Sequence, residues 1–371
     1  MRVIVTGGGT GGHIFPALAL ARHIKEMEPD SEFLYIGTEK GLEHDIVPKA
    51  GLPFQTIEVM GLKRKLGIDT IRTFIVLRRG LSQAKRLLRE FKPDVVIGTG
   101  GYVCAPVVYT AAKMKIPTVI HEQNAIPGLT NKMLARYASV VAVSFPDSEK
   151  YFKRAKRVVI SGNPRASEFR RLPADVAKES LSALHLQSDK KTVLVVGGSR
   201  GARPINEAVI SMLQKIEKEK KFQLLYVTGQ VHYEQIKEAC RQAGIGDSDW
   251  ISIQPFLYDM PKVLSAVDVI VGRAGATSLA EITSIGVPSI LIPSPYVANN
   301  HQFFNANWLV EHGAALLIPE AELNGERLYQ EICKIVGSAA VAGKMADQSR
   351  DLGYPHAAEI LYTTIQQIIK G

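Results

Sequence analysis

Two glycine-rich segments each stand between a short apolar run and a helical pattern. They read GGGTGGH at residues 7–13 and GGSRGA at residues 197–202. Glycines at such a place let backbone N–H groups approach an anion at the N-terminus of the helix. The two segments therefore predict cradles for phosphate-like groups, the alternative being tight turns that bind nothing.

The first segment also fits the G-x-G-x-x-G pattern of dinucleotide-binding turns through Gly7, Gly9 and Gly12. A dinucleotide site needs an acidic residue about 20 positions further on, at the end of the second strand. The run FLYIG offers only Glu39 beyond its end. His13 adds an imidazole, a common general base, which a dinucleotide loop does not need. We therefore interpret the segment as an anion site with a candidate base rather than as an NAD site.

A third segment, GRAGATSLAE at residues 272–281, also follows an apolar run and opens a helix. The start of that helix can face a phosphate, and Glu281 can accept hydrogen bonds from two ribose hydroxyls. Alternatively, Glu281 completes a capping box with Ser278, three residues before it, and is purely structural. The sequence alone leaves both interpretations open.

Polar residues follow two further apolar runs, in GTGGY at residues 98–102 and in HEQN at residues 121–124. Ligands of open parallel sheets bind outside the carboxyl ends of the strands, so these turns are expected to contribute to one site. GDSDW precedes an apolar run instead, and its Asp247 and Asp249 are interpreted as a solvated turn. Cys104, Cys240 and Cys333 have no metal-ligand spacing. We expect neither a metal nor a cofactor.

These segments need a scaffold of parallel strands. The 371 residues suffice for two domains of ordinary size. Continuous apolar runs separated by helical patterns indicate parallel sheets buried on both faces. Both halves begin with a strand, a glycine-rich turn and a helix. We therefore predict the α/β class with two tandem Rossmann-like, doubly wound parallel-sheet domains and a cleft between them. The expected strands lie at 2–7, 32–37, 94–100, 117–123 and 139–145, and at 192–198, 223–229, 250–256, 267–273 and 288–294.

The excess positive charge lies in the first half. Of a net charge of +9, residues 1–162 hold 24 Lys+Arg against 14 Asp+Glu, and residues 63–92 alone hold ten against two. Apolar residues at helical spacing there predict a helix packed on the sheet. Packing does not explain so basic a face, and each Lys or Arg near an anionic leaflet contributes roughly 1 kcal/mol. We predict attachment to an anionic membrane surface through Ile71, Arg72, Phe74, Ile75, Arg78, Arg79, Lys85 and Arg86.

Other partners and locations are less compatible with the sequence. The basic stretch lacks interleaved Tyr, Trp or His, so no nucleic acid is expected. The chain reaches glycine before any apolar stretch long enough for a signal peptide, and no run approaches the roughly 18 apolar residues of a membrane span. With 46% hydrophobic residues and a mean hydropathy of +0.03, we expect a globular cytoplasmic protein.

Jointly, the motifs GGGTGGHIFPALA, HEQN, GNP, GGSRGA, GRAGATSLAE and HQFFNA resemble the membrane-associated N-acetylglucosaminyltransferases of peptidoglycan synthesis. The resemblance implies a GT-B fold and a peripheral location at the cytoplasmic face of the bacterial cell membrane. It implies inverting, metal-independent transfer of GlcNAc from UDP-GlcNAc to undecaprenyl-pyrophosphoryl-MurNAc-pentapeptide (lipid I), which yields lipid II and UDP. Other proteins of cell-wall synthesis, cell shape and cell division are further expected partners.

The resemblance also assigns domains and contacts. Residues 1–163 are expected to bind lipid I and the membrane, residues 164–350 to bind UDP-GlcNAc, and residues 351–371 to form a helix that crosses back to the first domain. The predicted donor contacts are Thr10, Gly11, Gly12, Asn124, Arg165, Ser199, Leu257, Ala276, Thr277, Ser278, Glu281 and Gln302. The predicted acceptor contacts are Gly9, Thr10, Gly11, Gly12, His13, Gly100, Gly101, Tyr102, Glu122 and Asn124.

The transfer chemistry needs a general base on the attacking hydroxyl and donors for the departing diphosphate. His13 is the candidate catalytic base, although a carboxylate or a substrate phosphate could serve and His13 could merely orient the acceptor. Arg165, directly after GNP, and His301, beside Gln302, depart from the family pattern. Two rival functions stay open: another UDP-GlcNAc enzyme such as a 2-epimerase, and an inert UDP-sugar-binding membrane scaffold.

Overall fold

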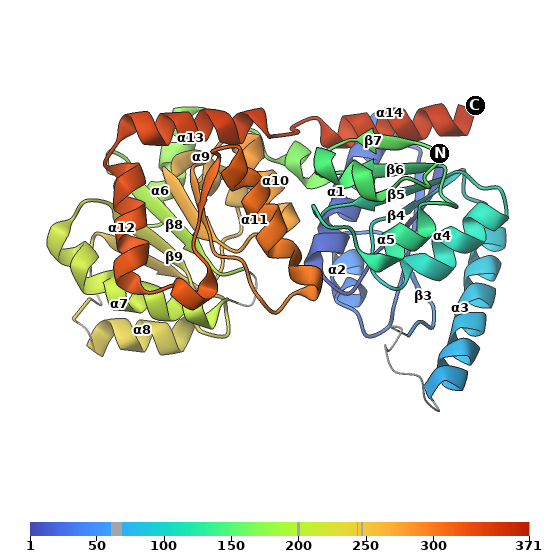
Figure 1. Cartoon of the computed structure of the whole chain (residues 1–371), viewed down its shortest axis with the longest axis horizontal. Coiled ribbons are helices and arrows are strands. Elements are labelled where there is room, and N and C mark those ends of the chain that lie inside the picture. The colour runs from blue at the N-terminus through green and yellow to red at the C-terminus, as the bar shows by residue number, and fades with distance from the viewer. Residues whose placement is uncertain (61–68, 199–200, 243, 246–247, 371) are drawn as a thin grey trace. The chain divides into compact units, whose positions relative to one another are not determined.

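The computed structural model describes residues 1–60, 69–198, 201–242, 244–245 and 248–370, without the side chains of residues 69–74, 174 and 178. The chain divides into two compact units (Figure 1). Unit 1 comprises residues 1–168 and 356–371, and unit 2 comprises residues 169–355. The sequence placed these divisions at 163/164 and 350/351. The first division lies later because the short helix at Pro164–Glu168 packs on helices of unit 1.

Unit 1 is built on a seven-stranded, fully parallel sheet with the strand order β3-β2-β1-β4-β5-β6-β7. Its central strands are short runs of β-branched residues, and every residue of β4 is buried. Strand order reverses between β1 and β4, which is the topological switch point of a doubly wound sheet. The strands are β1 Arg2–Thr6, β2 Glu32–Gly37, β3 Phe54–Thr56, β4 Val95–Gly98, β5 Thr118–Glu122, β6 Val140–Val143 and β7 Val158–Ile160.

The helices of unit 1 cover this sheet. In α1, Ile14, Ala17, Leu18, Ala21 and Ile24 are buried at helical spacing and pack on the sheet. The helices are α1 Gly11–Met27, α2 Glu43–Lys49, α3 Asp69–Phe91, α4 Cys104–Lys113, α5 Leu129–Leu134, η1 Pro146–Tyr151, η2 Pro164–Glu168 and α14 Ala357–Lys370. No helix in the described part of the chain combines the length and the hydropathy that crossing a membrane requires.

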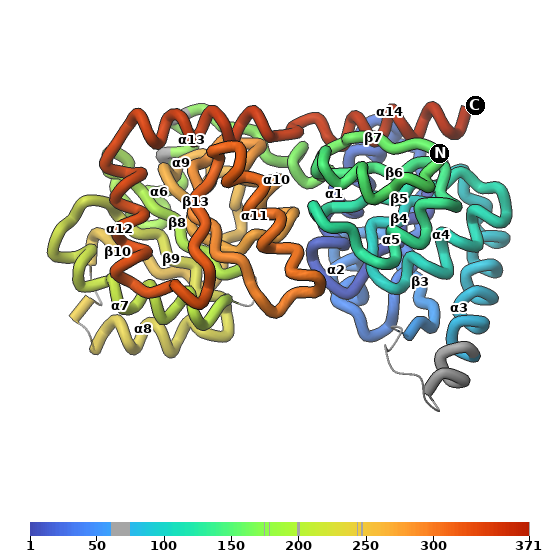
Figure 2. The backbone as a smooth tube through the Cα atoms, in the orientation of Figure 1, coloured from blue at the N-terminus to red at the C-terminus, as the bar shows by residue number. Residues whose placement is uncertain are grey.

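Helix α14 joins unit 1 from the far end of the chain, as Figure 2 shows by its red colour beside the blue α1. Leu361 and Ile365 are completely buried in the same core as α1 and β1. Ala358 donates its N–H to Ser167 Oγ at 3.0 Å, and Tyr362 donates its hydroxyl to Glu28 Oε1 at 2.9 Å. The core of unit 1 thus includes residues from both ends of the sequence.

Unit 2 repeats the plan with a six-stranded parallel sheet in the order β10-β9-β8-β11-β12-β13. The strands are β8 Thr192–Val196, β9 Gln223–Val227, β10 Ile251–Gln254, β11 Val269–Gly272, β12 Ser289–Leu291 and β13 Ala315–Leu317. The helices are α6 Ala174–Ser182, α7 Arg203–Glu219, α8 Tyr233–Gln242, α9 Met260–Ala266, α10 Ala276–Ile285, η3 Ala298–Asn300, α11 His301–Glu311, η4 Glu320–Glu322, α12 Gly325–Val336 and α13 Ala339–Asp351. The predicted α/β class with two Rossmann-like parallel-sheet domains is confirmed.

Candidate functional site

The loop between β1 and α1 lies at the switch point of the unit 1 sheet and carries the first glycine-rich segment. Gly9 has a φ of +84°, and Thr10, in extended conformation, is the N-cap of α1 without a side-chain cap bond. The first turn of α1 contains no acidic residue. The first N–H groups of a helix have no partner within the helix, so this end of α1 can donate to an anion.

His13 stands in the first turn of α1 with a fixed ring orientation. Its Nδ1 lies 2.9 Å from the carbonyl oxygen of Gly8 and 3.4 Å from Thr10 Oγ1. A carbonyl oxygen only accepts, so Nδ1 carries the hydrogen and donates it. In the neutral ring the lone pair is then on Nε2, the nitrogen that a general base uses. Among the described residues, none forms a hydrogen bond with Nε2.

The loop after β4 packs directly against this segment. Gly8 donates its N–H to Gly100 O at 3.2 Å, and Thr99 Oγ1 donates to His13 O at 2.7 Å. A Cβ on Gly100 would lie 2.7 Å from His13 Cδ2, and one on Gly101 would lie 2.5 Å from Gly8 O. Both glycines also have positive φ values, +118° and +87°. The two loops can approach this closely only because these positions lack side chains.

Tyr102, which follows these glycines, is 61% exposed. Most of the predicted acceptor contacts lie in two adjoining segments at the switch point, with Tyr102 directly after the second. They are Gly9, Thr10, Gly11, Gly12, His13, Gly100 and Gly101. That they contact an acceptor stays a prediction.

The buried carboxylate of Glu43 accepts a hydrogen bond from the first glycine-rich loop, a contact that the sequence did not reveal. Glu43 is completely buried at the start of α2, and its Oε2 accepts the N–H of Gly9 at 3.0 Å. Its Oε1 accepts the backbone N–H and the hydroxyl of Thr38, at 3.1 and 2.7 Å. No spacing rule marks a residue six positions beyond the second strand as a contact of the first loop.

The HEQN segment ends β5 and supplies a buried network rather than a row of exposed groups. Glu122 is only 2% exposed, and it accepts hydrogen bonds from Asn124 N at 3.0 Å, Gly128 N at 3.1 Å and Asn131 Nδ2 at 2.8 Å. Gln123 Nε2 donates to the carbonyl of Thr99 at 2.8 Å. Glu122 is thus occupied in shaping the turn that carries the half-buried Asn124.

His121 is the group of this network whose pKa is shifted by burial. It is 1% exposed; Nε2 donates to Gly162 O at 2.9 Å and Nδ1 accepts from Gln123 Nε2 at 2.9 Å. Burial disfavours the charged ring and lowers the pKa of His121 to about 4, although the bond to Gly162 opposes this. The side chain is therefore neutral at neutral pH.

The lowered pKa makes stability depend on pH. The unfolded chain takes up a proton on His121 below about pH 6.5, whereas the folded chain does so only below about pH 4. Between these values stability falls as the pH falls. We expect His121 to lower the free energy of unfolding, measured with urea, by about 2 kcal/mol at pH 5 relative to pH 7.5. The His121→Gln variant should lose that part of the pH dependence, and a variant with the wild-type pH dependence would contradict the assignment.

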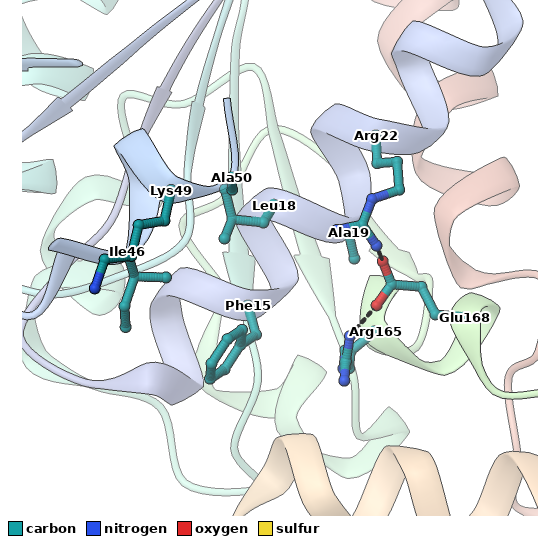
Figure 3. A pocket seen from close by; sticks show the side chains of 9 residues that line it. All are labelled: Phe15, Leu18, Ala19, Arg22, Ile46, Lys49, Ala50, Arg165 and Glu168. Carbon is teal, nitrogen blue, oxygen red and sulfur yellow. Dashed lines mark hydrogen bonds and ion pairs between the residues drawn. The ribbon is translucent and has the colours of Figure 1, made fainter. Parts of the chain in front are cut away.

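A hollow of about 280 Å³ lies in unit 1 beside α1 and α2 (Figure 3). Glu168 pairs with both Arg22 and Arg165, and the Arg165 guanidinium lies 5.8 Å from the centre of the Phe15 ring. Arg165 lies in unit 1 rather than in the predicted domain at 164–350, and it shares the Glu168 carboxylate with Arg22 there. A uridine contact through Arg165 stays a prediction. The hollow is lined by Phe15, Leu18, Ala19, Arg22, Ile46, Lys49, Ala50, Arg165 and Glu168.

The corresponding loops of unit 2 follow β8 and β11, the strands at which its order reverses. Gly198 and Gly201 have φ values of +92° and +73°, and a Cβ on Gly201 would lie 2.4 Å from Thr228 O. The predicted diphosphate contact Ser199 lies outside the described residues, as does Asp247 of GDSDW. The glycines of this loop are thus required by the backbone itself.

Helix α10 begins at Ala276, directly after this switch point. Its N-cap is Gly275, so no side-chain capping bond forms, and Ser278 is already the third helical residue. The capping-box interpretation of Glu281 is therefore wrong, because it requires Ser278 as the N-cap, whereas the actual N-cap, Gly275, lies one turn earlier. The first turn of α10 contains no acidic residue, and Thr277 Oγ1 is buried without a hydrogen-bond partner in the described structure.

The remaining predicted donor contacts have defined places. Gln302 lies in the first turn of α11 and accepts the N–H of Ser294 at 2.8 Å. His301 beside it donates Nδ1–H to Ala298 O at 2.8 Å. Leu257, 8% exposed, follows the exposed Phe256 after β10. Asn124 and Arg165 belong to unit 1. Contact of these residues with a donor stays a prediction.

Comparisons with known proteins cover nearly the whole chain. The glycosyltransferase family 28 N-terminal domain matches residues 3–143, and the family 28 C-terminal domain matches residues 192–361. The chain is 53% identical over 370 residues to the UDP-N-acetylglucosamine–N-acetylmuramyl-(pentapeptide) pyrophosphoryl-undecaprenol N-acetylglucosamine transferase of Halalkalibacterium halodurans, covering 100% of both chains. It is 51% identical to the protein of that name from Bacillus licheniformis, covering 99% of both.

Solved structures agree with this. The crystal structure of Acinetobacter baumannii MurG superposes with a TM-score of 0.77 at 30% identity, over 99% of both chains. A UDP-GlcNAc 2-epimerase from Neisseria meningitidis bound to UDP-GlcNAc has a TM-score of 0.68 at 14% identity, over 99% of this chain and 100% of that one. At so low an identity the second match shows a common fold alone.

Proposed function

We propose a function from one premise: the chain belongs to glycosyltransferase family 28, and within it to the pyrophosphoryl-undecaprenol N-acetylglucosamine transferases. The proposal is that it transfers GlcNAc from UDP-GlcNAc to lipid I with inversion at the anomeric carbon, giving lipid II and UDP. The observation that carries it is identity above 50%, over the full length, to proteins whose names specify this donor and this acceptor.

In this reaction His13 acts as the general base. As the acceptor hydroxyl attacks the anomeric carbon, Nε2 takes the hydroxyl proton while Nδ1–H stays bonded to Gly8 O. The bond from the anomeric carbon to the UDP oxygen breaks, and its electron pair leaves with UDP. Attack on the face opposite the leaving group converts the α-linked donor into a β-linked product. The loops at 7–10 and 99–102 hold the acceptor, and the start of α1 donates to its pyrophosphate.

Unit 2 holds the donor in this proposal. The departing diphosphate gains negative charge, which preorganised N–H groups at a helix start stabilise. The first turn of α10 suits this role, because it has no side-chain cap and no acidic residue and because Thr277 has a buried hydroxyl without a partner among the described residues. Glu281, one turn further on, takes the ribose hydroxyls. Gln302 contacts the sugar, and the backbone at Leu257 contacts the uracil.

The transfer assay tests the proposal. Purified protein is incubated with radiolabelled UDP-GlcNAc and a lipid I analogue, with and without EDTA, and the product is identified as the lipid-linked disaccharide. We expect equal transfer with and without EDTA and no turnover without the acceptor. Formation of ManNAc from UDP-GlcNAc alone would instead indicate a 2-epimerase. Binding of UDP-GlcNAc without turnover in any arm would indicate an inert scaffold.

Attachment to the cytoplasmic face of the membrane through α3 is part of the proposal. Ala84, Leu87 and Leu88 are buried at helical spacing, so one face of α3 packs within unit 1. The other face carries the exposed Ile75, Arg78, Arg79, Lys85 and Arg86. The ion pairs of Arg79 with Glu58 and of Arg86 with Glu90 are exposed and long, so they neutralise little. The side chains of Ile71, Arg72 and Phe74 lie outside the described residues.

Vesicle binding tests this surface. We expect binding to rise with the fraction of anionic lipid and to fall with salt. Each basic residue removed from α3 should weaken binding by roughly 1 kcal/mol. The variant replaces Arg78, Arg79, Lys85 and Arg86 by glutamine, and a control variant replaces the exposed Lys218, Lys220, Lys237 and Arg241 of unit 2. Equal binding to neutral vesicles, or equal losses in both variants, would contradict an electrostatic surface on α3.

A further inference from the structure

One peptide group connects the imidazole of His13 to the carboxylate of Glu43. The carbonyl of the Gly8–Gly9 peptide accepts Nδ1–H of His13 at 2.9 Å. The N–H of the same peptide donates to Oε2 of Glu43 at 3.0 Å. A hydrogen-bonded chain therefore runs from the ring, through a single peptide, to a buried anion.

Glu43 is built into place for this contact. Its side chain is completely buried, and its second oxygen is occupied by two donors of Thr38. Three glycines surround it: a Cβ on Gly8 would lie 2.4 Å from Glu43 Oε1, one on Gly41 2.2 Å from the same atom, and one on Gly37 2.6 Å from Glu43 Cγ. Both oxygens of this carboxyl group accept hydrogen bonds and neither donates one, which is the bonding pattern of an ionised carboxylate. Such a group is costly to bury unless it has partners, and it has three.

Hydrogen bonds in a chain polarise one another. A carboxylate bound to the Gly9 N–H draws the peptide dipole so that the Gly8 carbonyl becomes a better acceptor. This favours the tautomer of His13 with hydrogen on Nδ1 and the lone pair on Nε2. It also stabilises the positive charge that the ring carries once Nε2 has taken a proton, while that proton stays on the imidazole and Glu43 remains a carboxylate.

We propose that Glu43 is a positioning residue for His13, which it holds in the Nδ1–H tautomer through the Gly8–Gly9 peptide. The value of this tautomer for catalysis rests on the proposed function, in which Nε2 is the base. The tautomer itself does not depend on that function. The alternative is that Glu43 only ties α2 and Thr38 to the loop and has no influence on the ring.

The variant Glu43→Gln tests this with little change of shape. A glutamine amide has one accepting oxygen and one donating nitrogen, so it cannot accept from both Gly9 and Thr38. The matched control is Thr38→Val, which removes the hydroxyl bond to Oε1 and leaves the bond to Gly9 intact. ¹⁵N NMR of the imidazole nitrogens, with His13 assigned by the His13→Asn spectrum, reports the tautomer in the free protein.

We expect Nδ1–H to dominate in the wild type and in Thr38→Val, and Nε2–H to gain population in Glu43→Gln. In the transfer assay, kcat should fall at least tenfold in Glu43→Gln with KM for UDP-GlcNAc within twofold, and should stay within threefold in Thr38→Val. A wild-type tautomer in Glu43→Gln, or equal changes in both variants, would overturn the proposal. The proposal would also be overturned if the wild-type protein itself carried the hydrogen of His13 on Nε2. That measurement does not depend on whether any variant folds. A tautomer shift without loss of kcat would support the positioning and contradict the role of His13 as the base.

Discussion

Alanine at position 13 is expected to lower kcat/KM for the transfer reaction by about 10² to 10⁴, the range that general-base catalysis contributes. The reason is geometric: Nδ1 is engaged by Gly8 O, and Nε2 is the only ring nitrogen left to take a proton. The loss should be in kcat more than in the KM for UDP-GlcNAc, because the ring is proposed to act on the attacking hydroxyl. Steady-state kinetics with a lipid I analogue measure both.

The control for this experiment is His356→Ala. His356 is an exposed histidine of unit 1 that precedes α14 and forms an ion pair with the exposed Glu359. Its replacement should leave both the kinetics and the melting temperature unchanged. A His13→Ala enzyme with kcat/KM within about threefold of the wild type would have lost less than 1 kcal/mol of transition-state stabilisation. Such a result would rule out His13 as the general base.

Alanine at position 101 should cost both stability and activity. Gly101 has a φ of +87°, where a side chain costs roughly 1–2 kcal/mol. In addition, the new Cβ would lie 2.5 Å from the carbonyl oxygen of Gly8, so that carbonyl must move. The same carbonyl accepts Nδ1–H of His13. Because a misplacement of about 1 Å in a catalytic group can cost 10²-fold, we expect transfer to fall roughly 10- to 100-fold.

Gly51 offers a matched control for the cost of placing a side chain at a positive φ. Gly51 has a φ of +80°, and a Cβ built on it meets nothing within 4 Å. Gly51→Ala should therefore lose a similar 1–2 kcal/mol in urea unfolding while retaining full transfer activity. If both variants retain activity equally, the close approach of the two loops has no catalytic importance. If both lose it equally, the loss reports destabilisation alone.

The central strands were predictable because their residues are apolar without interruption and end in glycine-rich turns. The edge strands β3, β7 and β13 were not predicted; each has only three residues, and none is completely buried. Three residues cannot show a periodicity, and an edge strand is defined by the strand that it pairs with rather than by its own sequence. The repeated strand–turn–helix plan indicated two doubly wound parallel sheets, but the order of the strands and the places of both switch points come from the structure.

The sequence predicted the site residues that stand within the glycine-rich loops. It did not predict the residues that contact these loops from other elements of the fold. Gly9, His13, Gly100 and Gly101 stand in motifs whose shape follows from glycine. Glu43 reaches the same loop across 34 positions of sequence, through a contact that exists only once β1 and β2 are paired. The sequence left the role of Glu281 open; its capping-box interpretation was plausible because Ser278 is a typical cap residue, but the backbone already turns at Gly275.

Helix α14 imposes an order on the maturation of the chain. Leu361 and Ile365 fill the same core as the first strand, yet the ribosome delivers them only after all of unit 2 has been made. Domains generally fold as units during synthesis. We expect the middle of this protein to reach its native state first, while the segment synthesised earliest waits with an unfilled hydrophobic groove on α1. Nascent chains that stop before residue 357 should accordingly be the ones that chaperones hold and proteases cut.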